Sequence, residues 1–260
     1  VGGTNYIEQI VHAFDGEQIG NPDFINEEVF ALLILRKAGF ALDDKLVQTL
    51  MNYILDDQNE NGSWAQSTDM TAAAIQALLT VSNQRNVLPA IERAEQYLRA
   101  QQTEYGGFNN SEFSTAWGIQ AIHALGKSAA DWYKNGITPP EYLGHRQAED
   151  GGLAEIMSLD MRLWATAYAV PAALKKSWLQ LLSEFPKGEI GPKKEKLAEK
   201  EPETTPDIPE PESNQPLGNN SDVNPDQIQT EEKVEEQKTL VAEPAPELSA
   251  PEQLTTENER

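Results

Sequence analysis

The chain contains no cysteine and only three histidines among its 260 residues. It therefore cannot form a disulfide, offers no thiolate nucleophile and cannot bind zinc through sulfur. Basic residues are also scarce, with 20 Lys and Arg against 42 Asp and Glu. The one basic run, residues 193–200, is interrupted by Glu195 and Glu199. We therefore expect no cofactor and no nucleic-acid partner, because phosphate binding needs clustered positive charge.

Long apolar runs are absent as well. A membrane helix needs about eighteen or more consecutive apolar residues, and the nearest approach is residues 29–35. We expect no membrane span within this chain. The chain starts at Val1 without a basic segment and apolar core of the kind that begins a signal peptide. This start is expected either of a processed chain or of an excerpt.

The last part of the chain has almost no core-forming residues. Residues 185–260 hold 11 of the 16 prolines and 19 acidic side chains against 8 basic ones, and Phe185 is their only aromatic residue. Such a composition cannot bury enough apolar surface to offset chain entropy. We predict two parts, a folded domain over residues 1–184 and a disordered acidic, proline-rich tail over residues 185–260.

Within the first part, one short phrase occurs three times. Each copy has a Gln, a Gly-containing loop and an apolar or aromatic anchor six positions after the Gln, as in 58–64, 102–108 and 147–153. The anchors at 64, 108 and 153 lie 44 and 45 positions apart, and in the first two copies a Thr-Ala pair follows the anchor after the same interval. A period of this length suits two helices with their connections, which is typical of stacked helical hairpins.

Helical periodicity dominates the repeated region, and strand alternation is missing. Thr138-Pro139-Pro140-Glu141 has the features of a helix start, and Gly39 and Gly126 have those of helix ends. The pattern predicts an all-α fold of about four hairpins. The expected helices span residues 4–13, 25–38, 44–56, 69–82, 88–101, 113–125, 139–147, 160–173 and 175–184.

The Gln, the GSW, GGF and GGL loops and the Thr-Ala helix resemble prenyltransferase and squalene-oxidase repeats over roughly residues 45–180. That superfamily includes terpenoid cyclases and protein prenyltransferases. Membership implies an α/α toroid around a central cavity, usually with more hairpins than this chain offers, so either the ring is open or its first repeats precede Val1. Residues 162–171 are also similar to the closing helix of bacterial surface proteins, which implies an extracellular or cell-surface location.

The resemblance also implies structural roles for the repeated residues. The Gln would bond backbone groups at the start of the next helix, and the anchor would pack against the preceding helix. The residues to which we assign such roles are Gln58, Gly62, Gln102, Gly107, Phe108, Gln147 and Gly152.

The best catalytic candidate is a single acid, Asp69. Hopene-type cyclases carry three carboxylates before a Thr-Ala pair, and the matching stretch here keeps only the middle one, with Ser67 and Met70 at the flanking positions. An acid that protonates an alkene needs neighbours that hold and polarise its proton. Asp69 is therefore either a helix-start residue favoured by the dipole or a functional acid that faces a cavity. Asp160, at the start of the helix that follows the third copy of the loop, is interpreted in the same way.

A weak candidate for calcium binding is the loop with Asp57, Asn59 and Asn61, whose oxygens alternate before Gly62. Its twelfth position is Thr68, where calcium loops carry a bidentate Glu. A polar turn explains the same residues, and we predict no metal.

Three functions stay open. The first is a noncatalytic module that binds an apolar small molecule or a protein partner through Trp64, Asp69, Trp117 and Trp164. The second is an isoprenoid enzyme of the terpenoid-cyclase or prenyltransferase type with Asp69 as its acid, and the third is a structural spacer without a ligand.

Overall fold

A computed structural model describes residues 4–154, 158–186 and 188–191. All regular secondary structure in these ranges is helical, which confirms the all-α prediction, and the extended pairs are isolated bridges such as Gln102 with Phe108. The predicted tail lies outside the described residues apart from 185, 186 and 188–191. In the described part no helix is long and apolar enough to cross a membrane.

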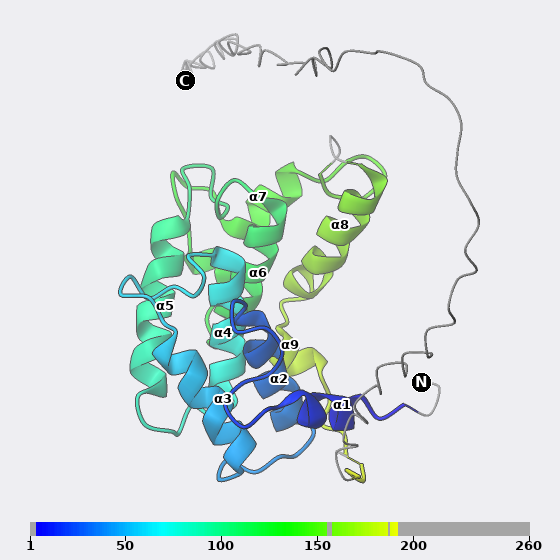
Figure 1. The fold of residues 1–260 in the computed structure, drawn as a ribbon. Coiled ribbons are helices and arrows are strands. Elements are labelled where there is room, and N and C mark those ends of the chain that lie inside the picture. The colour runs from blue at the N-terminus through cyan, green and yellow to red at the C-terminus, as the bar shows by residue number, and fades with distance from the viewer. Residues whose placement is uncertain (1–3, 155–157, 187, 192–260) are drawn as a thin grey trace, which may run out of the picture. The chain divides into compact units, whose positions relative to one another are not determined.

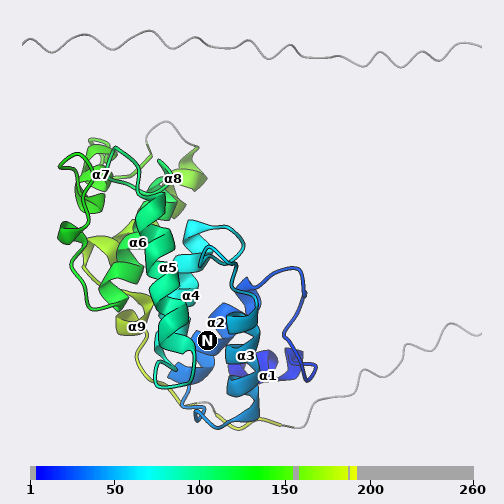
Figure 2. The same cartoon turned by 90° about the vertical axis from the view of Figure 1, so that its left-hand side faces the viewer.

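The helices alternate between two layers (Figure 1). An inner layer places α2, α4, α6 and α8 next to one another in that order, and an outer layer places α3 on α2, α5 on α4 and α7 on α6. Figure 2 shows the molecule from the side of α3 and α5. The helices are α1 (Tyr6–Ala13), α2 (Asn26–Lys37), α3 (Lys45–Asp56), α4 (Thr68–Leu79), α5 (Val87–Gln101), α6 (Glu112–Ala124), η1 (Ala129–Asp131, a 3-10 turn), α7 (Pro139–His145), α8 (Leu159–Ala173) and α9 (Trp178–Leu181).

Helix α4 lies at the centre of this arrangement. It contacts α2 and α6 on its flanks and α5 in the outer layer, and residues 71–78 are all buried. Four of these residues are alanines, which allow neighbouring backbones to approach closely. The Ala-rich sequence of α4 therefore reflects a helix that packs on several sides at once.

Local signals account for most helix ends. Ser67, Ser111 and Ser158 cap α4, α6 and α8, and their hydroxyls accept hydrogen bonds from backbone N–H groups in the first turn. The capping box predicted at Thr138 and Glu141 is present at the start of α7. The predicted helix over residues 175–184 is instead the four-residue α9, which docks against α6.

Candidate functional site

Each repeated loop is tied to the helix that follows it by a threonine. The main-chain N–H of the anchor donates to the threonine hydroxyl, and the hydroxyl donates to a carbonyl one turn earlier in the chain. The three anchor contacts are Trp64 to Thr71 at 3.1 Å, Phe108 to Thr115 at 2.9 Å and Leu153 to Thr166 at 2.9 Å. The Thr therefore fixes the start of each inner helix against its loop.

The repeated glutamine has a different partner from the one that the resemblance implied. In every copy its side-chain amide nitrogen donates to a carbonyl within the loop, four residues later, rather than to groups at the start of the next helix. The contacts are Gln58 to Gly62 at 3.0 Å, Gln102 to Gly106 at 2.9 Å and Gln147 to Gly151 at 2.9 Å. The Gln thus closes the loop.

Two kinds of glycine occur in these loops. Gly62, Gly106 and Gly151 have φ of +87°, +84° and +84°, a left-handed backbone that favours glycine. Gly107 is needed for space instead, since a Cβ there would lie 2.6 Å from the Tyr142 ring. Gly62, Gly106 and Gly151 are therefore equivalent positions, and Gly107 and Gly152 each follow one position later.

A fourth copy of the loop lies before α2 and was missed in the sequence. The N–H of Ile19 donates to the Glu28 carboxylate at 3.1 Å, in the way that each anchor donates to its threonine. Glu28 replaces the threonine, and the bridge from Phe14 to Ile19 spans one residue less than the bridges in the later copies. The pair α1–α2, the first in chain order, is therefore a hairpin of the same design as the other three.

The Glu28 carboxyl is an imperfect substitute. It is 1% exposed, and its Oε2 atom has no hydrogen-bond partner among the described residues. Burial raises the pKa of Glu28 above its ordinary value of 4.5, the Ile19 N–H opposes this rise, and the charges of Glu27 and Asp57 add to it. The ionised form is thus disfavoured in the folded protein.

A Glu28→Gln variant is expected to change how stability depends on pH. A carboxyl whose pKa is higher when folded binds protons more tightly in the native state, so it lowers stability as pH rises from its unfolded pKa through its folded pKa. The glutamine keeps the acceptor for Ile19 and removes this penalty. Thermal melting should show a stability difference between variant and wild type that grows across this pH window and then levels off. Glu60→Gln, at an exposed loop position, is the control; an equal difference at every pH would contradict the interpretation.

The threonine contacts also put the inner helices into register. The positions two before, two after and five after each threonine lie on one face, which we call the inner face, opposite the outer layer. In α4 these residues are Asp69, Ala73 and Gln76, in α6 they are Phe113, Trp117 and Gln120, and in α8 they are Trp164, Tyr168 and Pro171. In α2 the residue two positions after Glu28 is Phe30, which corresponds to Ala73 of α4. Asp160 was paired with Asp69 in the sequence, but Trp164 occupies the equivalent position because α8 begins earlier relative to its threonine.

The inner face carries a connected group of aromatic rings centred on Trp117. Ring centroids of Tyr168, Phe30 and Trp178 lie 5.7, 6.2 and 6.4 Å from it, and Phe113 lies 5.9 Å from Tyr168. Phe30 and Trp117 meet although α4 separates their helices, since α4 has only Ala73 in that register. We call these five residues the aromatic cluster.

Asp69 lies at one end of this face, in the first turn of α4. Ser67 rather than Asp69 caps the helix. Burial raises the pKa of the Asp69 carboxyl above its ordinary value of 3.8, and a hydrogen bond with the Ser114 hydroxyl partly lowers it. Where the cyclase motif has its other two carboxylates, this chain has Ser67 and Met70. The Ser67 hydroxyl already accepts from the Met70 N–H. Asp69 is therefore a lone, partly exposed acid with an elevated pKa.

The other candidate residues do not converge on one place. Trp64 is fully buried, and its indole N–H donates to the Ile54 carbonyl of α3 at 2.6 Å, so it belongs to the core. Trp117 is nearly buried within the aromatic cluster, whereas Trp164 is 62% exposed. By register Asp69, Trp117 and Trp164 share the inner face, and Trp64 does not.

The chain after α8 returns across the inner face. The N–H of Trp178 donates to the Gln76 side chain at 2.9 Å, and Lys37 donates to the Leu179 carbonyl at 2.7 Å. Further on, the Gly191 N–H donates to Glu8 of α1 at 3.0 Å. Residues 178–186 and 188–191 thus link the last hairpin to the first and cover one end of the inner face, and among the described residues they do not extend over the Asp69 end.

The loop with calcium-like spacing is held by its own side chains. The Asn61 side-chain oxygen accepts from the N–H and hydroxyl of Ser63, and the Asn59 amide donates to the same residue. Asp57 directly follows α3, and together with Asn59 it lines a pocket. Within the described ranges no group of three or more His, Asp or Glu side chains is placed to hold a metal ion.

Comparison with curated proteins finds a distant relative. The chain is 23% identical over 168 residues to squalene–hopene cyclase of Zymomonas mobilis, and the match covers 56% of this chain and 25% of the cyclase. The chain thus spans about a quarter of that enzyme's length. No family model matches the chain, and no solved structure matches it. The similarity supports a distant terpenoid-cyclase-like relationship.

Proposed function

We propose that this domain is a noncatalytic module that binds an apolar, isoprenoid-like molecule on the inner face. The observation that carries the proposal is the aromatic cluster, whose member Phe30 is 38% exposed, together with Trp164, which is 62% exposed and lies one helical turn before Tyr168 on α8. Large aromatic rings left open beside a packed aromatic group offer an apolar ligand both contact area and shape. We further propose, from the sequence resemblance alone, that the module is displayed at a bacterial cell surface.

The surroundings of Asp69 support binding rather than catalysis. Its flanking positions lack the carboxylates that hold and polarise the proton in the cyclase motif, and its described partner is the neutral Ser114 hydroxyl. A carboxyl with a raised pKa and no neighbouring carboxylate in the motif positions is a weak acid, whereas alkene protonation needs a strong one. In this proposal Asp69 is a polar residue at one end of an apolar binding surface.

The alternative is an enzyme that acts on an isoprenoid with Asp69 as acid. It is favoured by the similarity to squalene–hopene cyclase and by the elevated pKa of Asp69, which keeps its proton to higher pH. The two functions differ in one experiment. Incubation of the purified protein with squalene should leave the substrate unchanged by gas chromatography, whereas turnover that is abolished in Asp69→Asn would establish the enzyme instead.

Ligand binding is expected to depend on Trp164. With squalene in mixed micelles as the probe, the wild type should show a saturable rise in melting temperature and a change in tryptophan fluorescence, because ligand that binds only the native state stabilises it. Trp164→Ala should weaken apparent affinity about tenfold, as expected when a buried aromatic contact of about 1.4 kcal/mol is lost. Tyr133→Ala, which removes an exposed ring outside the inner face, should bind like the wild type. Equal affinity in Trp164→Ala and wild type would contradict the site, and no binding at all would favour the spacer.

A further inference from the structure

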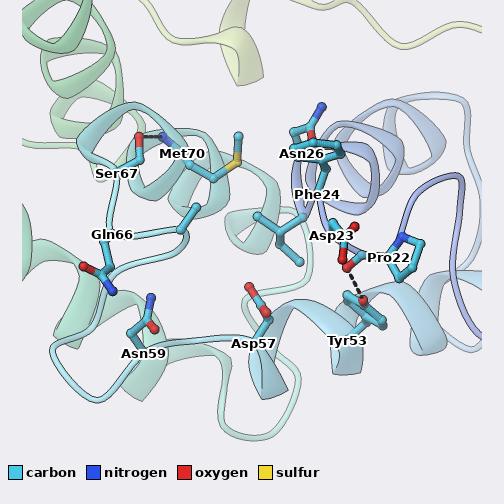
Figure 3. Close-up of a pocket in the computed structure, with 12 residues that line it drawn as sticks. Pro22, Asp23, Phe24, Asn26, Tyr53, Asp57, Asn59, Gln66, Ser67 and Met70 are labelled. Atoms are coloured by element: carbon cyan, nitrogen blue, oxygen red, sulfur yellow. Dashed lines mark hydrogen bonds between the residues drawn. The ribbon is translucent and has the colours of Figure 1, made fainter.

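A pocket separate from the inner face lies between the first two hairpins, and we call it the rim pocket. Its volume is about 580 Å³, and its walls come from the segment before α2, the end of α3 and the start of α4 (Figure 3). This size lies within the range of about 300–1,000 Å³ that is typical of small-molecule sites. The residues that line the rim pocket include Asp23, Phe24, Tyr53, Asp57, Asn59 and Met70. None of them belongs to the inner face defined above.

The rim pocket is acidic and contains no base. Asp23 and Asp57 contribute carboxylates, and no Lys, Arg or His is among the described residues that line it. Neither Asp23 nor Asp57 forms an ion pair with a described residue. Figure 3 shows the Asp57 carboxylate pointing into the space between the segment before α2 and the start of α4. The pocket therefore presents negative charge that the described protein leaves unneutralised.

A third acid lies behind the wall. Glu28 is buried, and the charge of Asp57 adds to the rise of its pKa. Burial and the charges of Glu28, Asp57 and Asp23, in that order, raise the pKa of Tyr53. Burial also raises the pKa of Asp57, even though its side chain stays open to solvent. The two carboxylates that line the pocket, Asp23 and Asp57, thus favour a cation there.

The same pocket has an apolar side. Phe24 is 57% exposed although it is a large aromatic residue, and Met70 lies across the pocket at the start of α4. An aromatic face attracts organic cations, and a methionine adapts to alkyl groups. A bare metal ion would gain nothing from either side chain, whereas a cation on a carbon stem would contact both.

We propose that the rim pocket binds an organic ammonium group on an apolar stem, with the cation next to Asp57 and Asp23 and the stem on Phe24 and Met70. The Tyr53 hydroxyl, 3.4 Å from both the Pro22 carbonyl and the Gln18 side-chain oxygen, adds a polar atom at the same wall. The ammonium group comes either from a free alkylamine or from a lysine side chain of a peptide. This activity is separate from apolar binding on the inner face and does not depend on it.

The test uses the full chain and isothermal titration calorimetry with n-hexylammonium. We expect saturable one-to-one binding that weakens with salt, and binding of 1-hexanol at least about tenfold weaker, because the neutral alcohol lacks the charge. Asp57→Asn should weaken hexylammonium binding about tenfold or more. Asp160→Asn, at an exposed position on α8, should bind like the wild type, and so should Trp164→Ala, which separates this site from the inner face.

Phe24→Ala provides a second variant, since Phe24 is exposed and its removal should leave folding intact. It should weaken hexylammonium binding without altering the salt dependence. The proposal is overturned if hexanol binds as well as hexylammonium, if Asp57→Asn and Phe24→Ala both bind like the wild type, or if calcium ions displace the amine with equal stoichiometry. A lysine amide blocked at its α-amino group that binds as tightly as hexylammonium would identify a protein side chain as the source, and weaker binding would identify a free amine.

Discussion

Replacement of Trp64 by alanine is expected to lower the free energy of unfolding by about 4 kcal/mol, the usual cost of deleting a large aromatic residue from a core. The side chain is fully buried, and its N–H donates to the Ile54 carbonyl. The variant leaves a cavity between the second loop and α3 and removes the partner of that buried carbonyl. Urea denaturation followed by circular dichroism measures the loss.

The matched control is Trp164→Ala. It removes the same side chain from the surface of α8, where 62% of the residue is exposed, so stability should change by less than about 0.5 kcal/mol. The two variants thus separate the structural tryptophan from the proposed binding tryptophan. Equal destabilisation by both variants would show that Trp164 is buried by a contact outside the described residues. Little effect of Trp64→Ala would contradict the structural role of the anchor.

The all-α fold and its hairpins were predictable because their signals are local and recur. The Gln, the Gly loop and the Thr-Ala pair recur at a fixed period, and each forms contacts within a few residues of itself. The first hairpin was predicted from its helices, but its loop was not recognised as a copy of the repeat because Glu28 replaces the threonine and the loop is shorter. A short loop with a different hydrogen-bonding side chain keeps the geometry while losing the sequence pattern.

The site was less predictable, because it depends on contacts between distant segments. Trp64 was both an anchor of the repeat and a candidate ligand contact in the sequence, and its packing against α3 places it in the core. Phe30 and Trp178 carried no motif, and they join Trp117 because α2 and the returning chain meet α6 across the inner face. Closure of the helices into a ring stays a prediction from the resemblance.

Replacement of Thr115 by valine is expected to lower the free energy of unfolding, because the Thr115 hydroxyl accepts from the Phe108 N–H. Valine has nearly the same shape but no hydroxyl, so the buried Phe108 N–H loses its acceptor and the Ser111 carbonyl loses a donor at 2.6 Å. An unpaired buried N–H costs about 1–3 kcal/mol, and we expect a loss of about 2 kcal/mol in the free energy of unfolding. Urea denaturation again provides the measurement.

Thr115→Ser is the matched control, since it keeps the hydroxyl and removes only a methyl group, and it should cost about 1 kcal/mol or less. A larger loss for serine than for valine would mean that the methyl group, not the hydroxyl, holds the loop.

In the first hairpin, Glu28→Thr is expected to raise the stability. It would install the residue found in the other three copies and remove a buried carboxylate oxygen that has no described partner. If the hydroxyl is what each loop needs, this variant should be more stable than the wild type at neutral pH, where the carboxylate is costliest.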